Sequence, residues 1–210
     1  MTNKHLQRAE ETKQTILTAA EKLFVKKGFD AVSIREIAKE AKCSHTTIYL
    51  YFKDKEALLH ELSMPSLEKL YDSIRKITDT ASKTAEAKLK EISHLFIRFC
   101  LTNKNMYTIF INEKSSRVDE VDPNLEINKI RIRLFSLIQQ TLGECIKIKS
   151  DEQLLAFSRI YFYNLYGILS TYSYQHEPTE VLIERLTPTF DLSVEVLLSG
   201  FKQIVRSEQK

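Results

Sequence analysis

The chain has 210 residues, 43% of them hydrophobic and 28% charged, and it contains only 4 glycines and 4 prolines. This length allows one large or two small domains with real hydrophobic cores, and the scarcity of turn-forming residues argues against an all-β fold. The formal net charge is +3, and residues 1–60 hold 11 Lys and Arg against 8 Asp and Glu, whereas the other 150 residues hold 20 of each. The positive excess therefore lies at the amino-terminal end, as expected of a segment that faces phosphate groups.

The three cysteines, Cys43, Cys100 and Cys145, are far apart and form no C-x-x-C pair, so we expect reduced thiols rather than disulfides or a zinc site. The amino terminus is polar and lacks the apolar segment of a secretory signal. The longest uncharged run, residues 160–175, is too short and too polar to span a bilayer. We therefore expect a cytoplasmic protein without a metal, a cofactor or a membrane segment.

The first elements are helical. The pattern predicts a polar arm over residues 1–11 and a helix over residues 12–27, which Gly28 ends by adopting the left-handed conformation. Ser33 and Glu36 then form the S-x-x-E pattern of a capping box at the start of a second helix.

A third helix follows a break at Lys42 and Cys43. Ser44 can cap its amino terminus, which leaves the small polar side chains after it and Tyr49 facing outward. Two short amphipathic helices joined by a tight turn form a helix-turn-helix, whose second helix enters the major groove of DNA. Together with the first helix they predict a three-helix DNA-binding unit.

A long connecting helix is expected next. Asp54 is a suitable amino-terminal cap, and apolar residues recur at helical spacing as far as Thr78. Pro65 is expected to kink this helix or to split it near Ser63.

The rest of the chain predicts further helices. A fifth helix covers residues 89–100, a short sixth helix covers residues 106–110, and a charged loop covers residues 113–122. Pro123 can begin the next helix, which is expected to end near Gly143.

Two long helices complete the pattern. Asp151 is expected to cap an eighth helix with two apolar faces, and in the last helix Pro188 marks a kink or a new start capped by Thr187. The whole pattern predicts an all-α fold of about nine helices. We expect a helix-turn-helix domain over residues 1–54, with the start of the connecting helix to about residue 60, and a larger helical domain over residues 55–210.

Many residues match a known family at fixed spacing, with no insertion or deletion between them. These positions are residues 19–24, 27–29, 32–38, 41, 44, 47, 49, 52, 55, 56 and 58. In this spacing, residues 12–60 resemble the DNA-binding domain of TetR-type (TetR/AcrR) transcriptional regulators. The remaining 150 residues are similar to that family only in being helical, aromatic-rich and divergent. Lys42 and Thr46 depart from the family, which usually has Gly in the turn and frequently at the start of the recognition helix.

The resemblance implies that residues 44–51 form the recognition helix. Its outward side chains are expected to face bases or nearby phosphates, while other contacts to the DNA backbone come from Tyr49, from the start of the connecting helix and from the preceding helix. The predicted DNA-contacting residues are Ser33, Arg35, Ser44, His45, Thr46, Thr47, Tyr49, Lys53 and Lys55.

The aromatic residues are concentrated in the carboxy-terminal domain, where six of the 11 Phe and six of the 9 Tyr lie between Phe96 and Tyr174. The resemblance implies an apolar effector pocket with a few polar groups in this domain. Taken one by one, the residues fit a hydrophobic core with tyrosines at its edge better. The predicted ligand-binding residues are His94, Phe99, Tyr107, Phe110, Tyr163, Asn164 and Tyr166.

The resemblance also implies a function. The expected protein is a homodimeric repressor, paired through its last two helices, that binds a near-palindromic operator in double-stranded DNA and is released by a small, largely apolar effector. Gly167 and Gly200 lie inside helix patterns, and either close approach of helices at such a seam or chance explains them. The alternative is a helical protein-interaction module or ligand-binding bundle that does not bind DNA.

No pattern of catalytic residues is present. The sequence contains no P-loop, no G-x-G-x-x-G and no H-E-x-x-H, so we do not expect an enzyme. Glu91 and His94 form a single E-x-x-H, which is half of a di-iron signature that requires a second copy and two further glutamates. The sequence therefore predicts no metal site.

Overall fold

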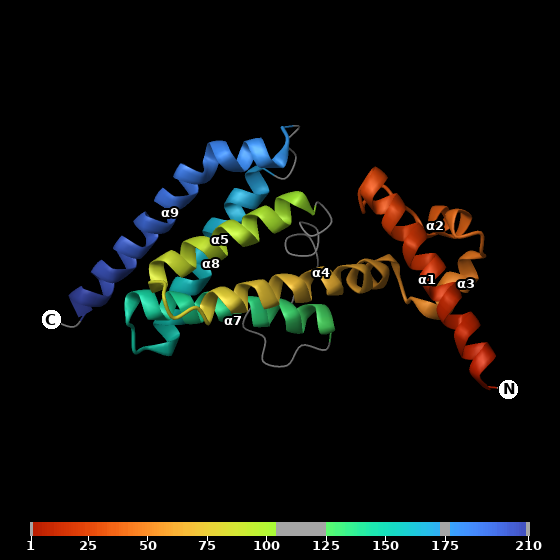
Figure 1. Cartoon of the computed structure of the whole chain (residues 1–210), viewed down its shortest axis with the longest axis horizontal. Helices are drawn as coiled ribbons and strands as arrows, with labels where there is room; N and C mark the ends of the chain where they lie inside the picture. Colours follow the sequence, from red (N-terminus) through yellow and green to blue (C-terminus); the bar gives the residue numbers. More distant parts are fainter. Residues whose placement is uncertain (1, 104–124, 173–176, 209–210) are drawn as a thin grey trace.

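The computed structural model describes residues 2–103, 125–172 and 177–208 of the chain. Within these ranges the chain forms eight helices and no strand, which confirms the expected all-α fold. With the labels of Figure 1, they are α1 (Thr2–Lys27), α2 (Ile34–Glu40), α3 (His45–Tyr51), α4 (Lys55–Thr78), α5 (Ala85–Thr102), α7 (Glu126–Ile146), α8 (Asp151–Tyr172) and α9 (Thr179–Glu208). The predicted short helix at 106–110, the charged loop at 113–122 and Pro123 lie outside the described residues.

The helices are arranged as a small amino-terminal unit and a larger body. Figure 1 shows α1, α2 and α3 grouped at one end of the molecule, with α4 running from this group into the body formed by α5, α7, α8 and α9. In the body, α4 and α5 pack against α7, and α5 also packs against α8 and α9. None of the helices in the described ranges combines the length and the apolarity needed to cross a bilayer.

Helix α1 begins much earlier than the sequence pattern predicts. The segment predicted to be a polar arm is helical from Thr2 onward, so that prediction is wrong. Residues 5–11 are exposed apart from the half-buried Ala9, and buried side chains begin only at Ile16. Hydrophobic periodicity cannot detect a helical extension that has no buried face. The carboxyl end of α1 is as predicted, because Gly28 has φ 82° and its N–H donates to the Phe24 carbonyl at 2.9 Å.

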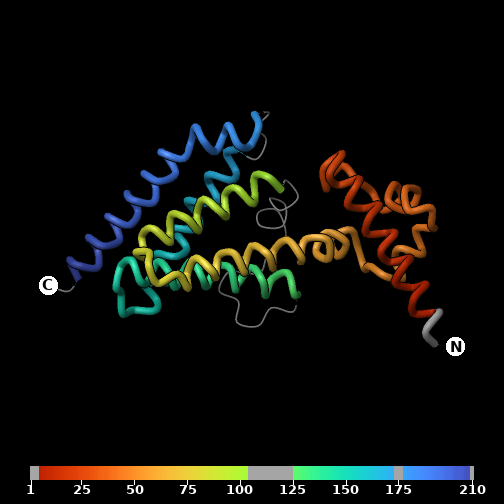
Figure 2. The backbone as a smooth tube through the Cα atoms, viewed as in Figure 1, coloured from red at the N-terminus to blue at the C-terminus, as the bar shows by residue number. Residues whose placement is uncertain are grey.

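Both prolines at which a kink or a break is expected lie inside continuous helices. Pro65 is within α4 and Pro188 is within α9. Thr187, the predicted new cap, instead donates its hydroxyl to the Ile183 carbonyl at 2.7 Å, as a threonine inside a helix does. Figure 2 shows α9 changing direction in its first half, where Pro188 removes a backbone hydrogen bond. This proline therefore bends its helix without ending it.

Two helix boundaries differ from the predicted positions by a few residues. Helix α7 continues past Gly143 and ends at Ile146, and the cap that follows, Lys147, has a left-handed φ of 54° and donates its N–H to the Gly143 carbonyl at 2.8 Å. Helix α8 begins at Asp151, but the capping side chain is Ser150, whose hydroxyl accepts the Gln153 N–H at 3.3 Å.

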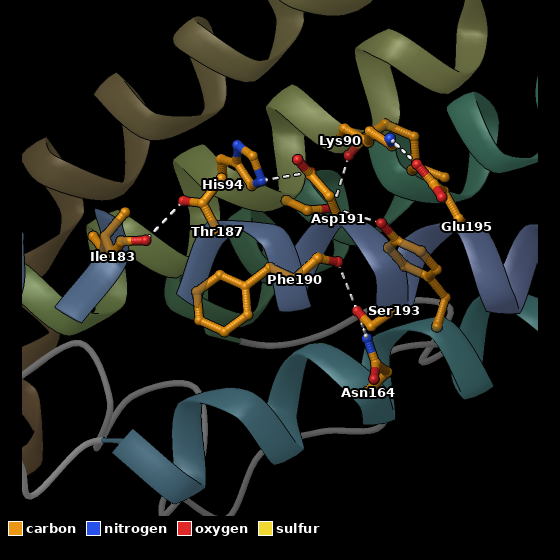
Figure 3. Close-up of polar contacts among 12 residues, drawn as sticks. Lys90, His94, Asn164, Ile183, Thr187, Phe190, Asp191, Ser193 and Glu195 are labelled. Carbon is orange, nitrogen blue, oxygen red and sulfur yellow. Dashed lines mark hydrogen bonds and ion pairs between the residues drawn. The ribbon is translucent and has the colours of Figure 1, made fainter. Parts of the chain in front are cut away.

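Four side-chain pairs, three of them ion pairs and the fourth a contact between a histidine and a carboxylate, link α9 to α5, and we call them the α5–α9 ladder. The α5 members recur at every fourth residue and therefore lie on one face of that helix. The pairs are Glu86–Lys202 (2.8 Å), Lys90–Glu195 (2.6 Å), His94–Asp191 (2.9 Å) and Arg98–Glu180. Figure 3 shows the two central pairs. Because one face of α9 is held by its own chain, the other face is available for contacts outside the chain.

Candidate nucleic-acid interface and effector region

The predicted capping box at the start of α2 is present. The Ser33 hydroxyl accepts the Glu36 backbone N–H at 3.3 Å, and the Glu36 carboxylate accepts the Ser33 backbone N–H at 2.9 Å. The Lys27 ammonium, also 2.7 Å from this carboxylate, and the Ser33 donors lower the pKa of Glu36 to about 2. Helix α2 is thus tied to the end of α1 by a carboxylate that is ionised at neutral pH. Arg35, the next predicted contact, is exposed.

The turn between α2 and α3 has the hydrogen bonds of a Schellman motif. Cys43 donates its N–H to the Ala38 carbonyl at 3.0 Å, and Lys42 donates to the Lys39 carbonyl at 3.3 Å. Lys42 has φ 53°, the left-handed conformation that favours glycine, at a cost of roughly 1 kcal/mol for a residue with a Cβ. Burial raises the pKa of the Cys43 thiol, which disfavours the thiolate form.

Helix α3 presents a polar surface at its amino-terminal end. Ser44 caps the helix by accepting the Thr47 N–H at 3.0 Å, and the two hydroxyls lie 2.8 Å apart. His45, Thr46 and Tyr49 are exposed, while Ile48 on the opposite face is fully buried. The structure therefore places three of the predicted base-reading or backbone-contacting side chains on one free surface, beside the hydroxyl pair.

The two predicted lysine contacts differ in their surroundings. Lys53 is exposed and makes no ion pair within the described residues. Lys55 is half-buried, and its ammonium donates to the Phe29 carbonyl at 2.9 Å and the Val32 carbonyl at 3.0 Å. The same ammonium lies 4.1 Å from the centre of the Phe29 ring. Lys55 thus joins the first turn of α4 to the loop between α1 and α2, and two of its three N–H groups are used inside the chain.

Charge on this unit is distributed unevenly. The carboxylates of Glu36 and Glu40 on α2 are paired with lysines of α1, Lys27 and Lys22 respectively. By contrast, several cations on α2, its following turn and the end of α3 have no ion pair within the described part of the chain; they are Arg35, Lys39, Lys42 and Lys53. Part of the unpaired positive charge of this unit therefore lies on the elements that flank the α3 surface, where it can contact phosphates.

The predicted ligand-binding residues are not brought together in the described structure. Tyr163 and Tyr166 lie on the outer face of α8, with 64% and 37% of their surfaces exposed. His94 and Asn164 instead contact α9: His94 Nε2 is 2.9 Å from Asp191 Oδ1, although the two atoms are not aligned for a hydrogen bond, and Asn164 donates to the Ser193 hydroxyl at 3.2 Å (Figure 3).

The remaining members of the ligand set are divided between described and undescribed parts of the chain. Phe99 is half-buried and packs against the core, whereas Tyr107 and Phe110 lie outside the described residues. Helix α8 has two apolar faces, and its spacing alone does not indicate which of them turns outward. Within the ranges that the structure describes, no group of three or more His, Cys, Asp or Glu side chains is placed to hold a metal ion.

Sequence reasoning also missed a buried polar pair in the body. Tyr161 is fully buried, and its hydroxyl lies in hydrogen-bond contact with Ser93 across α8 and α5. Burial raises the pKa of Tyr161, so its hydroxyl stays protonated. The aromatic density of this region could have suggested a buried tyrosine, but no sequence signal links residues so far apart.

The exposed faces of α8 and α9 carry apolar side chains and bare glycines, which we call the α8–α9 stripe. A Cβ added at Gly167 or Gly200 would have no atom within 4 Å. The large apolar members of the stripe are Ile160, Tyr163, Tyr166, Leu192, Val196 and Ile204. Apolar side chains that gather on an exposed surface are typical of sites of contact with another protein.

Comparison with known proteins agrees with these features. Residues 16–62 match the family model described as "Bacterial regulatory proteins, tetR family". The chain is 28% identical over 132 residues to the uncharacterised HTH-type transcriptional regulator YuxN of Bacillus subtilis, a match that covers 61% of this chain and 45% of YuxN. It is 31% identical over 91 residues to the HTH-type transcriptional regulator HbdR of an Aromatoleum species, covering 43% and 35% of the two chains. The chain thus spans less than half the length of these curated relatives.

Solved structures share the fold over nearly the whole chain. The transcriptional regulator FadR from Bacillus subtilis, crystallised in complex with stearoyl-CoA, superimposes with a TM-score of 0.60 at 22% identity, covering 90% of this chain and 98% of FadR. The family match falls on α1 to α4, where the two helix caps and the positive-φ turn build the helix-turn-helix. Residues 16–62 of this chain thus carry the amino-terminal domain of the tetR family of bacterial regulatory proteins.

Proposed function

We propose that this chain is a cytoplasmic, DNA-binding transcriptional regulator that acts as a homodimeric repressor. Residues 1–54 would form its DNA-binding domain, and residues 55–210 would bind an effector and a second copy of the chain. The observation that carries the proposal is the α3 surface. This short helix is capped by Ser44 and buries Ile48, and it leaves His45 and Thr46 exposed at its amino-terminal end and Tyr49 exposed one turn later.

The α3 surface suits the major groove. An α-helix fits this groove, and residues near the amino terminus of a recognition helix reach the base edges. His45 and Thr46 are the side chains best placed for that contact, while Arg35 and Lys53 supply charge for the phosphates on either side. These contacts would make binding strongly dependent on salt.

The α8–α9 stripe supports dimerisation through the last two helices. A two-fold pairing of α8 and α9 would bury the apolar side chains of both copies in a four-helix seam. Gly167 and Gly200 would let the helices approach closely, because neither position carries a side chain that must be accommodated. Such a dimer presents two α3 helices, and successive major grooves on one side of DNA are about 34–36 Å apart.

A small, largely apolar effector is the proposed signal. The FadR structure contains stearoyl-CoA, and another structure of the same fold, a TetR variant from Acinetobacter baumannii, contains minocycline. Shifting a two-state switch from 1:99 to 99:1 needs about 5.5 kcal/mol of differential affinity. Burying about 300 Å² of apolar ligand surface yields about 7.5 kcal/mol, so an ordinary ligand suffices if it fits only one state.

The proposal is tested by a binding screen against genomic promoter fragments, followed by salt titration on the fragment that binds best. We expect a specific fragment with a near-palindromic sequence and an affinity that falls steeply with salt. Thr46→Ala should reduce the preference for this fragment over random DNA, whereas Lys69→Ala, an exposed change on α4 far from α3, should not. Equal binding to all fragments, or binding that salt leaves unchanged, would favour the interaction-module alternative.

A further inference from the structure

A cleft lies where the amino-terminal unit meets the body. Its walls come from the end of α1, from residues 59–66 of α4 and from the end of α5, and its volume is about 650 Å³. It is separate from the α3 surface and from the α8–α9 stripe. Figure 1 shows that α4 is the helix joining the two parts of the molecule, so the cleft occupies the corner at which their relative orientation is set.

Ser63 lines this cleft and has an unusual environment. Only 1% of its surface is exposed, and within the described residues its hydroxyl has no hydrogen-bond partner. Serine in a helix commonly donates to the carbonyl four residues earlier, as Ser73 and Ser158 do here at 2.8 and 2.7 Å. A buried hydroxyl without a partner destabilises the protein that holds it, and a bound molecule could supply the missing hydrogen bond.

The same turn of α4 contains Pro65. Proline has no N–H, so the Glu61 carbonyl lacks the backbone donor that the helix would otherwise provide. A helix bends most readily at a turn where its hydrogen-bond ladder is interrupted. The cleft therefore lies against the most deformable turn of the helix that connects the two parts.

The lining indicates the class of molecule that the cleft would accept. Phe24, Leu59 and the half-buried Leu62 provide apolar surface. The polar groups on the α4 and α5 walls are neutral, and they include the Asn103 side chain, whose amide N–H donates to the Phe99 carbonyl at 2.8 Å. The charged lining residues belong to the α1 wall; Lys27, one of them, is already paired with a carboxylate of α2.

We propose that this cleft is a second small-molecule site, distinct from the effector region described above, and that it takes a neutral amphipathic molecule with a hydroxyl group. The hydroxyl pairs with Ser63, and the apolar part packs against Phe24 and Leu59. A molecule held there joins α1 to the Pro65 turn of α4 and fixes the orientation of the amino-terminal unit relative to the body.

The test uses 1-octanol as the probe and 1-chlorooctane as a probe of similar size that cannot donate a hydrogen bond. Binding to the full-length protein is measured by NMR titration or calorimetry, without DNA, so the outcome does not depend on the proposed regulatory function. Three variants are compared with the wild type. Ser63→Ala removes the unpaired hydroxyl, Val25→Trp fills the cleft from an exposed position of α1, and Leu6→Trp is a matched exposed change on α1 outside the cleft.

We expect saturable binding of 1-octanol with one site per chain. Ser63→Ala should weaken it about 3- to 10-fold, the effect of one neutral hydrogen bond, while leaving 1-chlorooctane binding unchanged. Ser63→Ala should also leave the melting temperature of the free protein unchanged or higher, because no hydrogen bond is lost. Val25→Trp should abolish binding and Leu6→Trp should preserve it. The proposal is overturned if 1-octanol does not bind saturably, or if all three variants bind it as the wild type does.

Discussion

Lys55 allows a direct separation of structural and DNA-contacting roles. We consider Lys55→Met, which keeps most of the apolar stem and removes the ammonium. The change deletes two hydrogen bonds from a charged donor, to the carbonyls of Phe29 and Val32, and the contact with the Phe29 ring. Lys53→Met is the matched control, because Lys53 is exposed and has no ion pair among the described residues.

The expected effect on stability follows from these contacts. A hydrogen bond from a charged donor contributes about 1.5–3 kcal/mol when buried, and the half-exposed position of Lys55 reduces that value. With a cation–π contribution of about 0.5–1 kcal/mol, we expect the free energy of unfolding to fall by about 2–3 kcal/mol. For a chain of this length, that loss lowers the melting temperature by about 4–12 °C. Lys53→Met should change stability by less than about 0.5 kcal/mol.

Thermal unfolding followed by circular dichroism measures the first effect, and operator binding across a salt series measures the second. Each phosphate contact contributes about 0.9 to the slope of log affinity against log salt. Lys53→Met should lower this slope by about 0.9 per protomer, and Lys55→Met should leave it unchanged. If Lys55→Met instead preserves the melting temperature and lowers the slope as Lys53→Met does, Lys55 is a phosphate contact and its role as an internal link between α4 and the α1–α2 loop is refuted.

Three further predictions concern the seam, the groove contact and pH. Val196→Glu places a charge in the α8–α9 stripe of both copies, and light scattering should show a dimer dissociation constant raised by about 100-fold or more; an unchanged dimer would move the seam elsewhere. Thr47→Ala should weaken operator binding by about 1 kcal/mol, roughly fivefold, in a gel-shift assay while leaving the dimer intact. Because Lys27 and Ser33 lower the pKa of Glu36 from 4.5 to about 2, the stability that this carboxylate contributes is complete above pH 4.5 and is lost as pH falls towards 2. Lys27→Met should raise this pKa in an NMR titration, and an unchanged value would show that the ion pair does not form in solution.

Local signals in the sequence predict the amino-terminal unit well. Ser33, Ser44 and Asp54 each cap the helix that they are expected to cap, because a cap depends on only three or four neighbouring residues. Gly28 and Lys42 both take the left-handed conformation that a helix end or a tight turn requires. Lys42 stands where the family usually has glycine. It therefore raises the free-energy cost of this turn but does not change its shape.

Features that depend on distant residues cannot be predicted in the same way. The partners of Lys55 lie 23 and 26 residues earlier in the chain, so nothing near Lys55 reveals them. Tyr163 and Tyr166 are predicted to line a pocket, but hydrophobic spacing does not say which apolar face of α8 turns outward. The sequence pattern also fails to predict the start of α1, because the first turns of this helix bury no apolar face.

The α5–α9 ladder has a mechanical consequence. Its α5 members are one helical turn apart, so a slide of α9 by a fraction of a turn would break all four pairs together. Each exposed pair is weak alone, but their shared spacing favours discrete positions of α9 over intermediate ones. A displacement of α5 then carries α9 with it on both sides of the bend at Pro188, because Glu180 precedes the bend and the other three α9 members follow it. In the proposed dimer the α8–α9 stripe on its far face would move with it, so a displacement inside one chain would reach the second copy without being absorbed by slippage between helices.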